Sequence, residues 1–166
     1  MKGIGALLVL GSAVWLGRAL AKPLRRRVML LEAWANCIGF LIPAIVWQQT
    51  PLPTALSDAA RAYPILSKVL NSITQQLAER LIDVGTAFER ALVEESALRP
   101  RDRQLLGDMA AKLGTSATSY QSDMLRTTEA LVRQVAKEAR GEDLKQARLV
   151  ESLISLSGLA LVILLL

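Results

Sequence analysis

GIGALLVLGSAVWLGRALA, residues 3–21, is the stretch that decides the fold, because it is apolar or small throughout except at Arg18. As a helix, these 19 residues would span roughly 28 Å at about 1.5 Å per residue, close to the hydrocarbon thickness of a bilayer. Only Lys2 and the α-amino group precede the run, whereas a juxtamembrane basic cluster follows it: Lys22, Arg25, Arg26 and Arg27. Because cations beside membrane helices stay in the cytoplasm, we predict a transmembrane anchor at residues 1–22 whose C-terminal end is cytoplasmic.

The end of this run permits a second interpretation, as a cleaved signal peptide. Ala19-Leu20-Ala21 resembles a small-x-small cleavage site, and the remaining chain would then be an exported helical binding module. However, Lys2 is the only cation at the start of the chain, Arg18 lies just before the site, and the mature chain would begin with cations that oppose export. The uncleaved anchor is therefore favoured. The intact mass of the protein from membranes distinguishes the two interpretations.

A second apolar run closes the sequence, LVESLISLSGLALVILLL at residues 149–166. Its 18 residues would cover roughly 27 Å as a helix. Arg140, Lys145 and Arg148 precede it, and no cation follows. We therefore predict a C-terminal transmembrane segment at residues 149–166, with both termini outside the cytoplasm and a cytoplasmic helical domain at residues 23–148.

Val28–Gln48 is almost as apolar as the anchor and has two interpretations. Either it is a core helix of the cytoplasmic domain, or it crosses the membrane and moves that domain to the other side. Glu32 and Asn36 are four residues apart and share one helical face, and a charge at such a depth in lipid would be costly. These features favour the core helix.

Local signals divide the segment that follows into helices. Pro51 and Pro53 end one helix and pre-set the first turn of the next, and Pro64 starts another. Asp83 is a candidate N-cap for a helix at Val84–Val93.

The last third of the sequence predicts one short helix and one long helix. The turn at residues 99–103 introduces a helix over Gln104–Leu113, which Gly114 ends, and Ser116 or Thr118 then caps the long helix. Spacings of three and four residues predict its packing face: Tyr120, Met124, Thr128, Leu131 and Val135. Its opposite face is charged: Asp123, Arg126, Glu129, Arg133 and Lys137.

The composition argues against catalysis and against metal or cofactor binding. The chain has no histidine, the commonest general acid or base near neutral pH and a frequent metal ligand. Cys37 is the only cysteine and is expected to be a small packed residue. The acidic pairs Glu94-Glu95 and Glu142-Asp143 are expected to be solvated. We therefore predict a protein that is not an enzyme and has no cofactor, metal site or small-molecule substrate.

The net charge of +5 does not indicate nucleic-acid binding. Six of the 20 cations lie at or before Arg27, and no acidic residue precedes Glu32. The remaining 14 cations and 15 acidic residues leave a net charge of −1. Because the positive charge sits beside an apolar run rather than on the folded domain, we expect the basic cluster to contact membrane lipid.

In length, order and motifs, the whole chain resembles the stage III sporulation protein AB family. The resemblance rests on the anchor, the apolar helix after it, the C-terminal tail and three motifs: TPLPTAL at 50–56, VGTAFERAL at 84–92 and LLGDMAAKLG at 105–114. That family in turn resembles the cytoplasmic domain of type II secretion F proteins. The resemblance implies an all-α antiparallel bundle of about six helices with N- and C-terminal transmembrane helices.

The resemblance also implies a place in the complex that spans the membranes between mother cell and forespore. The implied partners are a cytoplasmic ATPase, stage III sporulation protein AA, and other proteins of the same operon. The family offers no catalytic residue to carry over. Two basic surfaces are our candidates for docking the partner: Arg99, Arg101 and Arg103 in the turn, and Arg126, Arg133 and Lys137 on the long helix. The sequence leaves open whether the chain self-associates.

Overall fold

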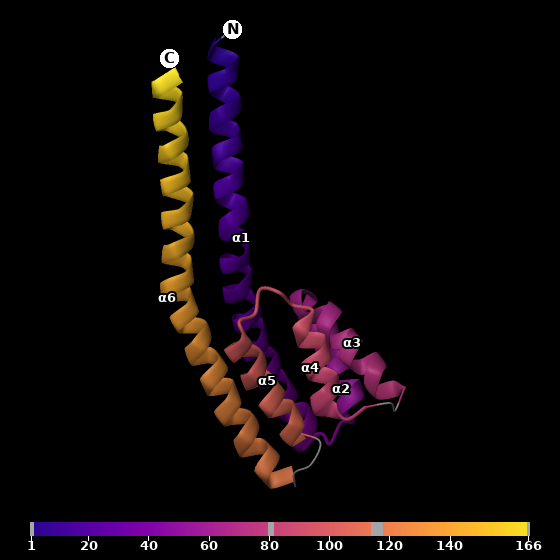
Figure 1. The fold of residues 1–166 in the computed structure, drawn as a ribbon. Helices are drawn as coiled ribbons and strands as arrows, with labels where there is room; N and C mark the ends of the chain where they lie inside the picture. Colours follow the sequence, from indigo (N-terminus) through magenta and orange to yellow (C-terminus); the bar gives the residue numbers. More distant parts are fainter. Residues whose placement is uncertain (1, 80–81, 114–117, 166) are drawn as a thin grey trace. The chain divides into compact units, whose positions relative to one another are not determined.

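The computed structural model describes residues 2–79, 82–113 and 118–165, and every regular element in these ranges is a helix (Figure 1). The α-helices are α1 (Lys2–Ile42), α2 (Leu52–Ala62), α3 (Ser67–Ala78), α4 (Val84–Val93), α5 (Pro100–Leu113) and α6 (Thr118–Leu165). A π-helical turn, η1 (Pro43–Trp47), follows α1, and a 3-10 turn, η2 (Pro64–Leu66), precedes α3. The prediction of an all-α fold is confirmed.

The chain folds as two compact units, and α1 and α6 contribute to both. The hairpin unit comprises Met1–Val28 and Glu138–Leu166, and the bundle unit comprises Met29–Lys137. The sequence predicted instead an anchor at 1–22, a domain at 23–148 and a second membrane segment at 149–166. The predicted bounds state which residues lie in the membrane, whereas the two units describe packing, so the predicted bounds stay a prediction.

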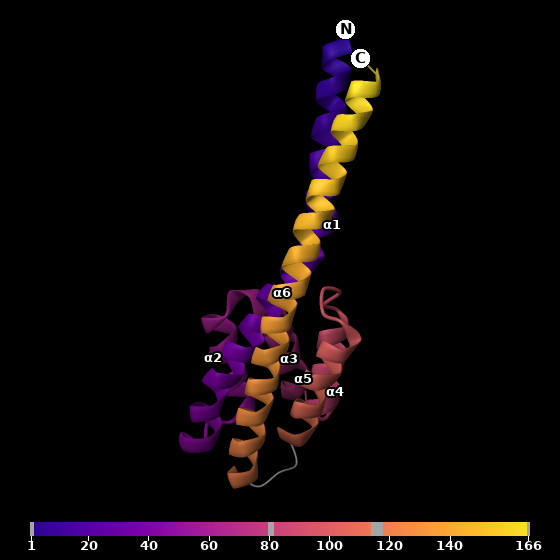
Figure 2. The same cartoon turned by 90° about the vertical axis from the view of Figure 1, so that its left-hand side faces the viewer.

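The hairpin unit consists of two helical segments packed along small residues (Figures 1 and 2). Ala13, Gly17 and Ala21 repeat every four residues on the face of α1 that meets α6, and Ala21 is fully buried. A Cβ at Gly158 would lie 2.6 Å from the Cβ of Ala13, closer than side chains can approach. Small residues let membrane helices pack closely where no hydrophobic effect drives association.

The outer surface of the hairpin unit is apolar. Leu8 and Trp15 in α1 are 70% and 72% exposed, and Leu153 and Ile163 in α6 are 64% and 68% exposed. Within the described residues, two helical stretches are long and apolar enough to cross a membrane, Gly11–Trp47 and Ser122–Ile163. Exposed apolar surface on paired helices is suited to lipid, so the parts of both stretches that lie in the hairpin unit indicate membrane association.

Packing in the hairpin unit predicts a specific cross-link. A Cβ at position 17 would lie 3.6 Å from the Cβ of Ile154, within the separation of about 3.5–4.5 Å that a disulfide requires. We expect Gly17→Cys/Ile154→Cys, in a Cys37→Ala background, to lose both thiols on mild oxidation in membranes. Maleimide labelling after denaturation measures this loss. Gly11→Cys/Ile154→Cys is the control, because nothing lies within 4 Å of a Cβ at Gly11; equal yields in both variants would contradict the packing.

The C-terminal part of α1 lies in the core of the bundle unit. Leu31, Trp34, Ile38 and Leu41 are fully buried, and the Trp34 ring packs on Phe88 of α4 at a centroid distance of 6.1 Å. Along Val28–Gln48, the helix therefore buries its apolar side in the bundle, as the core-helix interpretation requires. Asn36 on its polar face is exposed, and its carbonyl accepts a hydrogen bond from the Tyr63 hydroxyl.

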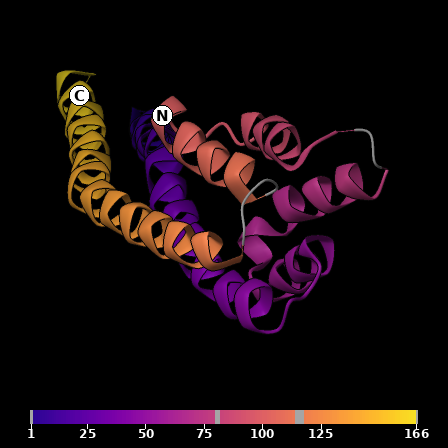
Figure 3. The same cartoon turned by 90° about the horizontal axis from the view of Figure 1, so that it is seen from below.

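The remaining helices complete the bundle unit around this core. Helix α2 packs against α3, α3 against α4, and α4 against α5, and Figures 1 and 3 show α4, α5 and the start of α6 running in alternating directions. The α5–α6 connection at residues 114–117 lies outside the described residues, and so do the predicted roles of Gly114 and Ser116.

Three of the predicted helix starts are confirmed. Pro51 is the N-cap residue of α2, with Pro53 in its first turn. Pro64 opens the 3-10 turn that leads into α3. Asp83 caps α4, where its carboxylate accepts hydrogen bonds from the backbone N–H and the hydroxyl of Thr86. These two hydrogen bonds stabilise the carboxylate and lower the pKa of Asp83.

The predicted start of α5 is wrong by four residues. The helix begins at Pro100 rather than Gln104, because the buried Asp102 carboxylate accepts a hydrogen bond of 2.9 Å from the backbone N–H of Arg99. An acidic side chain at the third helical position that reaches back to the N-cap amide is half of a capping box.

The predicted packing face of α6 is correct at Thr128, but the other buried residues lie one position after the predicted ones. The structure buries Leu125, Thr128 and Val132 in the bundle unit, whereas Leu131 is 44% exposed. Apolar residues occur at adjacent positions here, so a spacing of three and four fits two neighbouring faces equally well. Met124 and Val135 are half-buried, and the side chain of Tyr120 lies outside the described part.

Candidate docking surfaces

The structure divides the predicted basic cluster between two roles. Lys22, Arg25 and Arg26 are exposed, but Arg27 is only 7% exposed, and its Nη1 lies 2.5 Å from Oδ2 of Asp143. Arg25 pairs with Glu151 at 2.7 Å near the surface. Arg27 is therefore a structural residue of the hairpin unit, and the expectation that Asp143 is solvated is wrong, since that side chain is completely buried.

The predicted basic face of α6 is exposed on the bundle unit. Arg126, Arg133 and Lys137 are all exposed, and their spacings of seven and four residues place them on one helical face. Arg133 also pairs with Glu129 one turn earlier at 2.5 Å. Among the described residues, no carboxylate lies within salt-bridge distance of Arg126 or Lys137, so their charges are available to a partner.

The arginines around the start of α5 do not share one environment. Arg99 and Arg101 are exposed, whereas Arg103 is half-buried and lines an open groove of about 450 Å³ between α4 and α5. Its Nε is buried without a hydrogen-bond acceptor. Val93, which is 60% exposed, forms part of the same groove. Arg103 therefore places a cationic side chain beside apolar surface in this groove, whereas its unsatisfied Nε is buried and out of reach of a docked partner.

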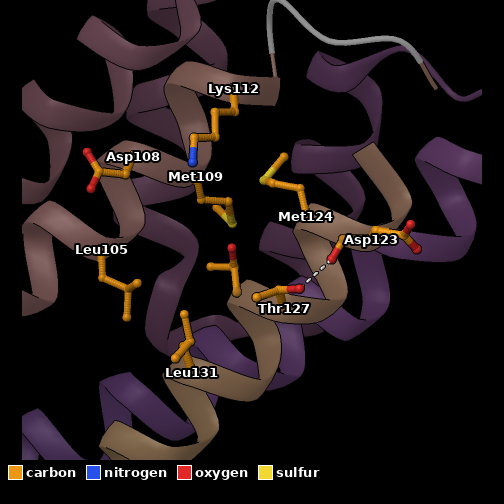
Figure 4. A pocket seen from close by; sticks show the side chains of 9 residues that line it. Leu105, Asp108, Met109, Lys112, Asp123, Met124, Thr127 and Leu131 are labelled. Carbon is orange, nitrogen blue, oxygen red and sulfur yellow. Dashed lines mark hydrogen bonds between the residues drawn. The ribbon is translucent and has the colours of Figure 1, made fainter. Parts of the chain in front are cut away.

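A second groove lies between α5 and α6 of the bundle unit and was not predicted (Figure 4). Its volume is about 410 Å³. The apolar lining consists of Leu105, Met109, Met124 and Leu131, and the polar lining of Asp108, Lys112, Asp123, Thr127 and Thr128. Methionine is flexible and polarisable and adapts to different partners. The sequence signal for this groove was Leu131. It follows Arg126 by five residues, which places it about 140° around the helix from Arg126 and outside the charged face.

The bundle unit holds no reactive constellation among its described residues. No group of three or more potential metal-ligating side chains occurs in the part of the chain that the structure describes. Cys37 is buried, and this burial raises the pKa of its thiol to about 12. Because a thiolate rather than a thiol is the nucleophile, Cys37 is unreactive at neutral pH. It is a packed core residue, as predicted.

The fold and these surfaces define a membrane-associated, all-helical bundle protein. The profile of the family described as Stage III sporulation protein AB matches residues 2–166. The chain is also 26% identical over 172 residues to the Stage III sporulation protein AB of Bacillus subtilis (strain 168), with 99% of each chain covered. The chain belongs to the stage III sporulation protein AB family, which supports a role in sporulation. No solved structure matches it significantly.

Proposed function

We propose that this chain is a non-enzymatic, membrane-anchored platform component of the stage III sporulation complex between mother cell and forespore. The hairpin unit anchors it in the mother-cell membrane, and the bundle unit faces the cytoplasm and docks the ATPase, stage III sporulation protein AA. The family match over residues 2–166 carries the proposal. The apolar outer surface of the hairpin unit supports the anchoring role.

The exposed basic face of α6 is the docking surface that we favour. It presents Arg126 and Lys137 without an intramolecular ion pair among the described residues, so a partner that carries carboxylates would neutralise them. Charge pairing across an interface steers association and fixes its orientation. The neighbouring groove between α5 and α6 would add an apolar contact through Leu131 and Met124.

Charge reversal tests this docking surface. We expect Arg126→Glu/Arg133→Glu/Lys137→Glu to lower the affinity of the detergent-solubilised protein for the purified ATPase by about tenfold or more, since several charge pairs become repulsive. Surface plasmon resonance measures the affinity. The control reverses three exposed cations of α2, α3 and α4, namely Arg61, Lys68 and Arg90. An unchanged affinity in the α6 variant, or the same loss in the control, would remove this face from the proposal.

Cysteine labelling tests the predicted topology. We expect single cysteines at Asn71 and Gln104, both exposed in the bundle unit, to resist a membrane-impermeant maleimide in intact, non-sporulating cells that express the chain, and to react after lysis. The background is Cys37→Ala. A cysteine added after residue 166 is the control and should react in intact cells. If Asn71→Cys reacts in intact cells, the bundle unit lies outside the cytoplasm, and the ATPase cannot be its partner.

A further inference from the structure

One face of α1 in the hairpin unit points away from α6 and is unusual in its composition. Leu8, Gly11, Trp15, Arg18 and Lys22 follow one another at alternating steps of three and four residues, so they form one stripe along the helix. All five are exposed, and nothing lies within 4 Å of a Cβ at Gly11. We name these five residues the outward stripe.

The outward stripe is apolar at one end and cationic at the other. Leu8 and Trp15 are 70% and 72% exposed. Arg18 and Lys22 lie about one and two turns beyond Trp15 along the helix. Arg18 lies ten positions after Leu8, which corresponds to about 15 Å of helix, half the hydrocarbon thickness of a bilayer. The span from Leu8 to the first cation of the stripe therefore has the length of the acyl layer of one leaflet.

The charges of Arg18 and Lys22 are not neutralised within the protein. Among the described residues, no carboxylate lies within salt-bridge distance of either side chain. The two nearby acidic residues of α6 have other partners, since Glu151 pairs with Arg25 and Asp143 with Arg27. Both cations are therefore available to an anion from outside the chain. At the edge of a bilayer, that anion is a lipid phosphate.

We propose that the outward stripe is a binding site for an anionic phospholipid. Arg18 and Lys22 hold the phosphate, Arg18 through the planar fork of its guanidinium, and one acyl chain lies along Leu8, Gly11 and Trp15. Because Gly11 has no side chain and nothing lies within 4 Å of a Cβ at this position, it leaves space for the acyl chain. Trp15 has the amphipathic indole that favours the boundary between acyl chains and headgroups. The site goes beyond the docking function, since it lies on the hairpin unit.

Quenching of Trp15 by brominated lipid tests the site. The full chain carrying Trp47→Phe is reconstituted in phosphatidylcholine vesicles with a minor fraction of brominated phosphatidylglycerol or, separately, brominated phosphatidylcholine. Trp34 is fully buried and provides a constant background. We expect the brominated anionic lipid to reach the same quenching of Trp15 at a lower mole fraction than brominated phosphatidylcholine. The mole fraction should be lower by about fivefold for each cation that contacts the lipid. The preference should fall as salt is raised, because salt screens exposed charges.

Two variants make the test decisive. In Arg18→Gln/Lys22→Gln, the two brominated lipids should quench Trp15 equally. Lys68→Gln/Arg90→Gln, an equal loss of exposed charge in the bundle unit, should keep the stronger quenching by the anionic lipid. The cross-link between positions 17 and 154 verifies that the hairpin forms in each variant. Equal quenching in the unsubstituted stripe, or a preference that survives in Arg18→Gln/Lys22→Gln, would overturn the site. Protection of Trp15 from both lipids would also overturn it, since a second protein helix would then cover the stripe.

Discussion

Asp143→Ala is expected to destabilise the hairpin unit by about 3–5 kcal/mol, because it removes the carboxylate from a buried ion pair and leaves the guanidinium of Arg27 buried. The side chains of Arg27 and Asp143 are only 8% and 1% exposed, and their charged atoms lie 2.5 Å apart. A buried charge that loses the carboxylate of its ion pair does not regain the hydration that it lost on folding. The hairpin should therefore open far more often than in the unsubstituted protein.

Opening of the hairpin can be measured with a buried thiol. Ala147 is fully buried in the hairpin unit, so Ala147→Cys in a Cys37→Ala background should react with maleimide only when the helices separate. At about 1.4 kcal/mol for each factor of ten, the labelling rate in detergent should rise by roughly two to three and a half orders of magnitude with Asp143→Ala.

Two further variants separate the loss of a pair from the loss of a charge. Arg27→Met/Asp143→Leu should label at nearly the rate of the unsubstituted protein, since replacing a whole buried pair with apolar side chains is often neutral. Glu151→Ala should have an effect of about 0–1 kcal/mol, because the Arg25 side chain is 49% exposed and remains solvated. Equal rates for Asp143→Ala and Glu151→Ala would show that the Arg27–Asp143 pair is not buried.

Phe88→Ala is expected to destabilise the bundle unit by about 3–5 kcal/mol. Phe88 is fully buried and its ring lies 6.1 Å from that of Trp34, so removing it leaves a cavity between α1 and α4 in the centre of the core. Both the burial of the ring and its contact with a second aromatic side chain are lost.

Unfolding by urea in detergent, followed by the fluorescence of Trp34, measures this loss. Trp15→Phe and Trp47→Phe remove the other two tryptophans, both of which are 72% exposed. Val93→Ala on the same helix is the control, because Val93 is 60% exposed and surface changes stay within about 0.5 kcal/mol. A Phe88→Ala protein as stable as the Val93→Ala protein would mean that α4 does not pack on Trp34.

Features with a local physical cause could be predicted from the sequence. The Asp83 cap depends on a hydrogen bond to Thr86 three residues away, and the helix starts at Pro51 and Pro64 depend on the fixed backbone angle of proline. The start of α5 has an equally local cause in Asp102. It was missed because the neighbouring arginines and the proline favoured a turn over a capped helix.

The candidate surfaces were less predictable. The exposure of Arg126, Arg133 and Lys137 follows from an unbroken charged face, and the structure places all three at the surface. The groove between α5 and α6 could not be foreseen, since it requires Leu131 to lie outside the packed face. Which of two adjacent helical faces is buried depends on the neighbouring helices, and helical spacing alone does not identify them.

By itself, the sequence determined the helical class, the two apolar segments and the family, because chain length, composition and motif order are local or cumulative properties. Only the tertiary structure decided which charges serve the fold and which remain for partners. Arg27 pairs with a residue 116 positions away, while Arg18 and Lys22 have no such partner among the described residues. Residues so far apart along the chain meet only when the helices pack, so no local pattern distinguishes Arg27 from Lys22 five residues before it.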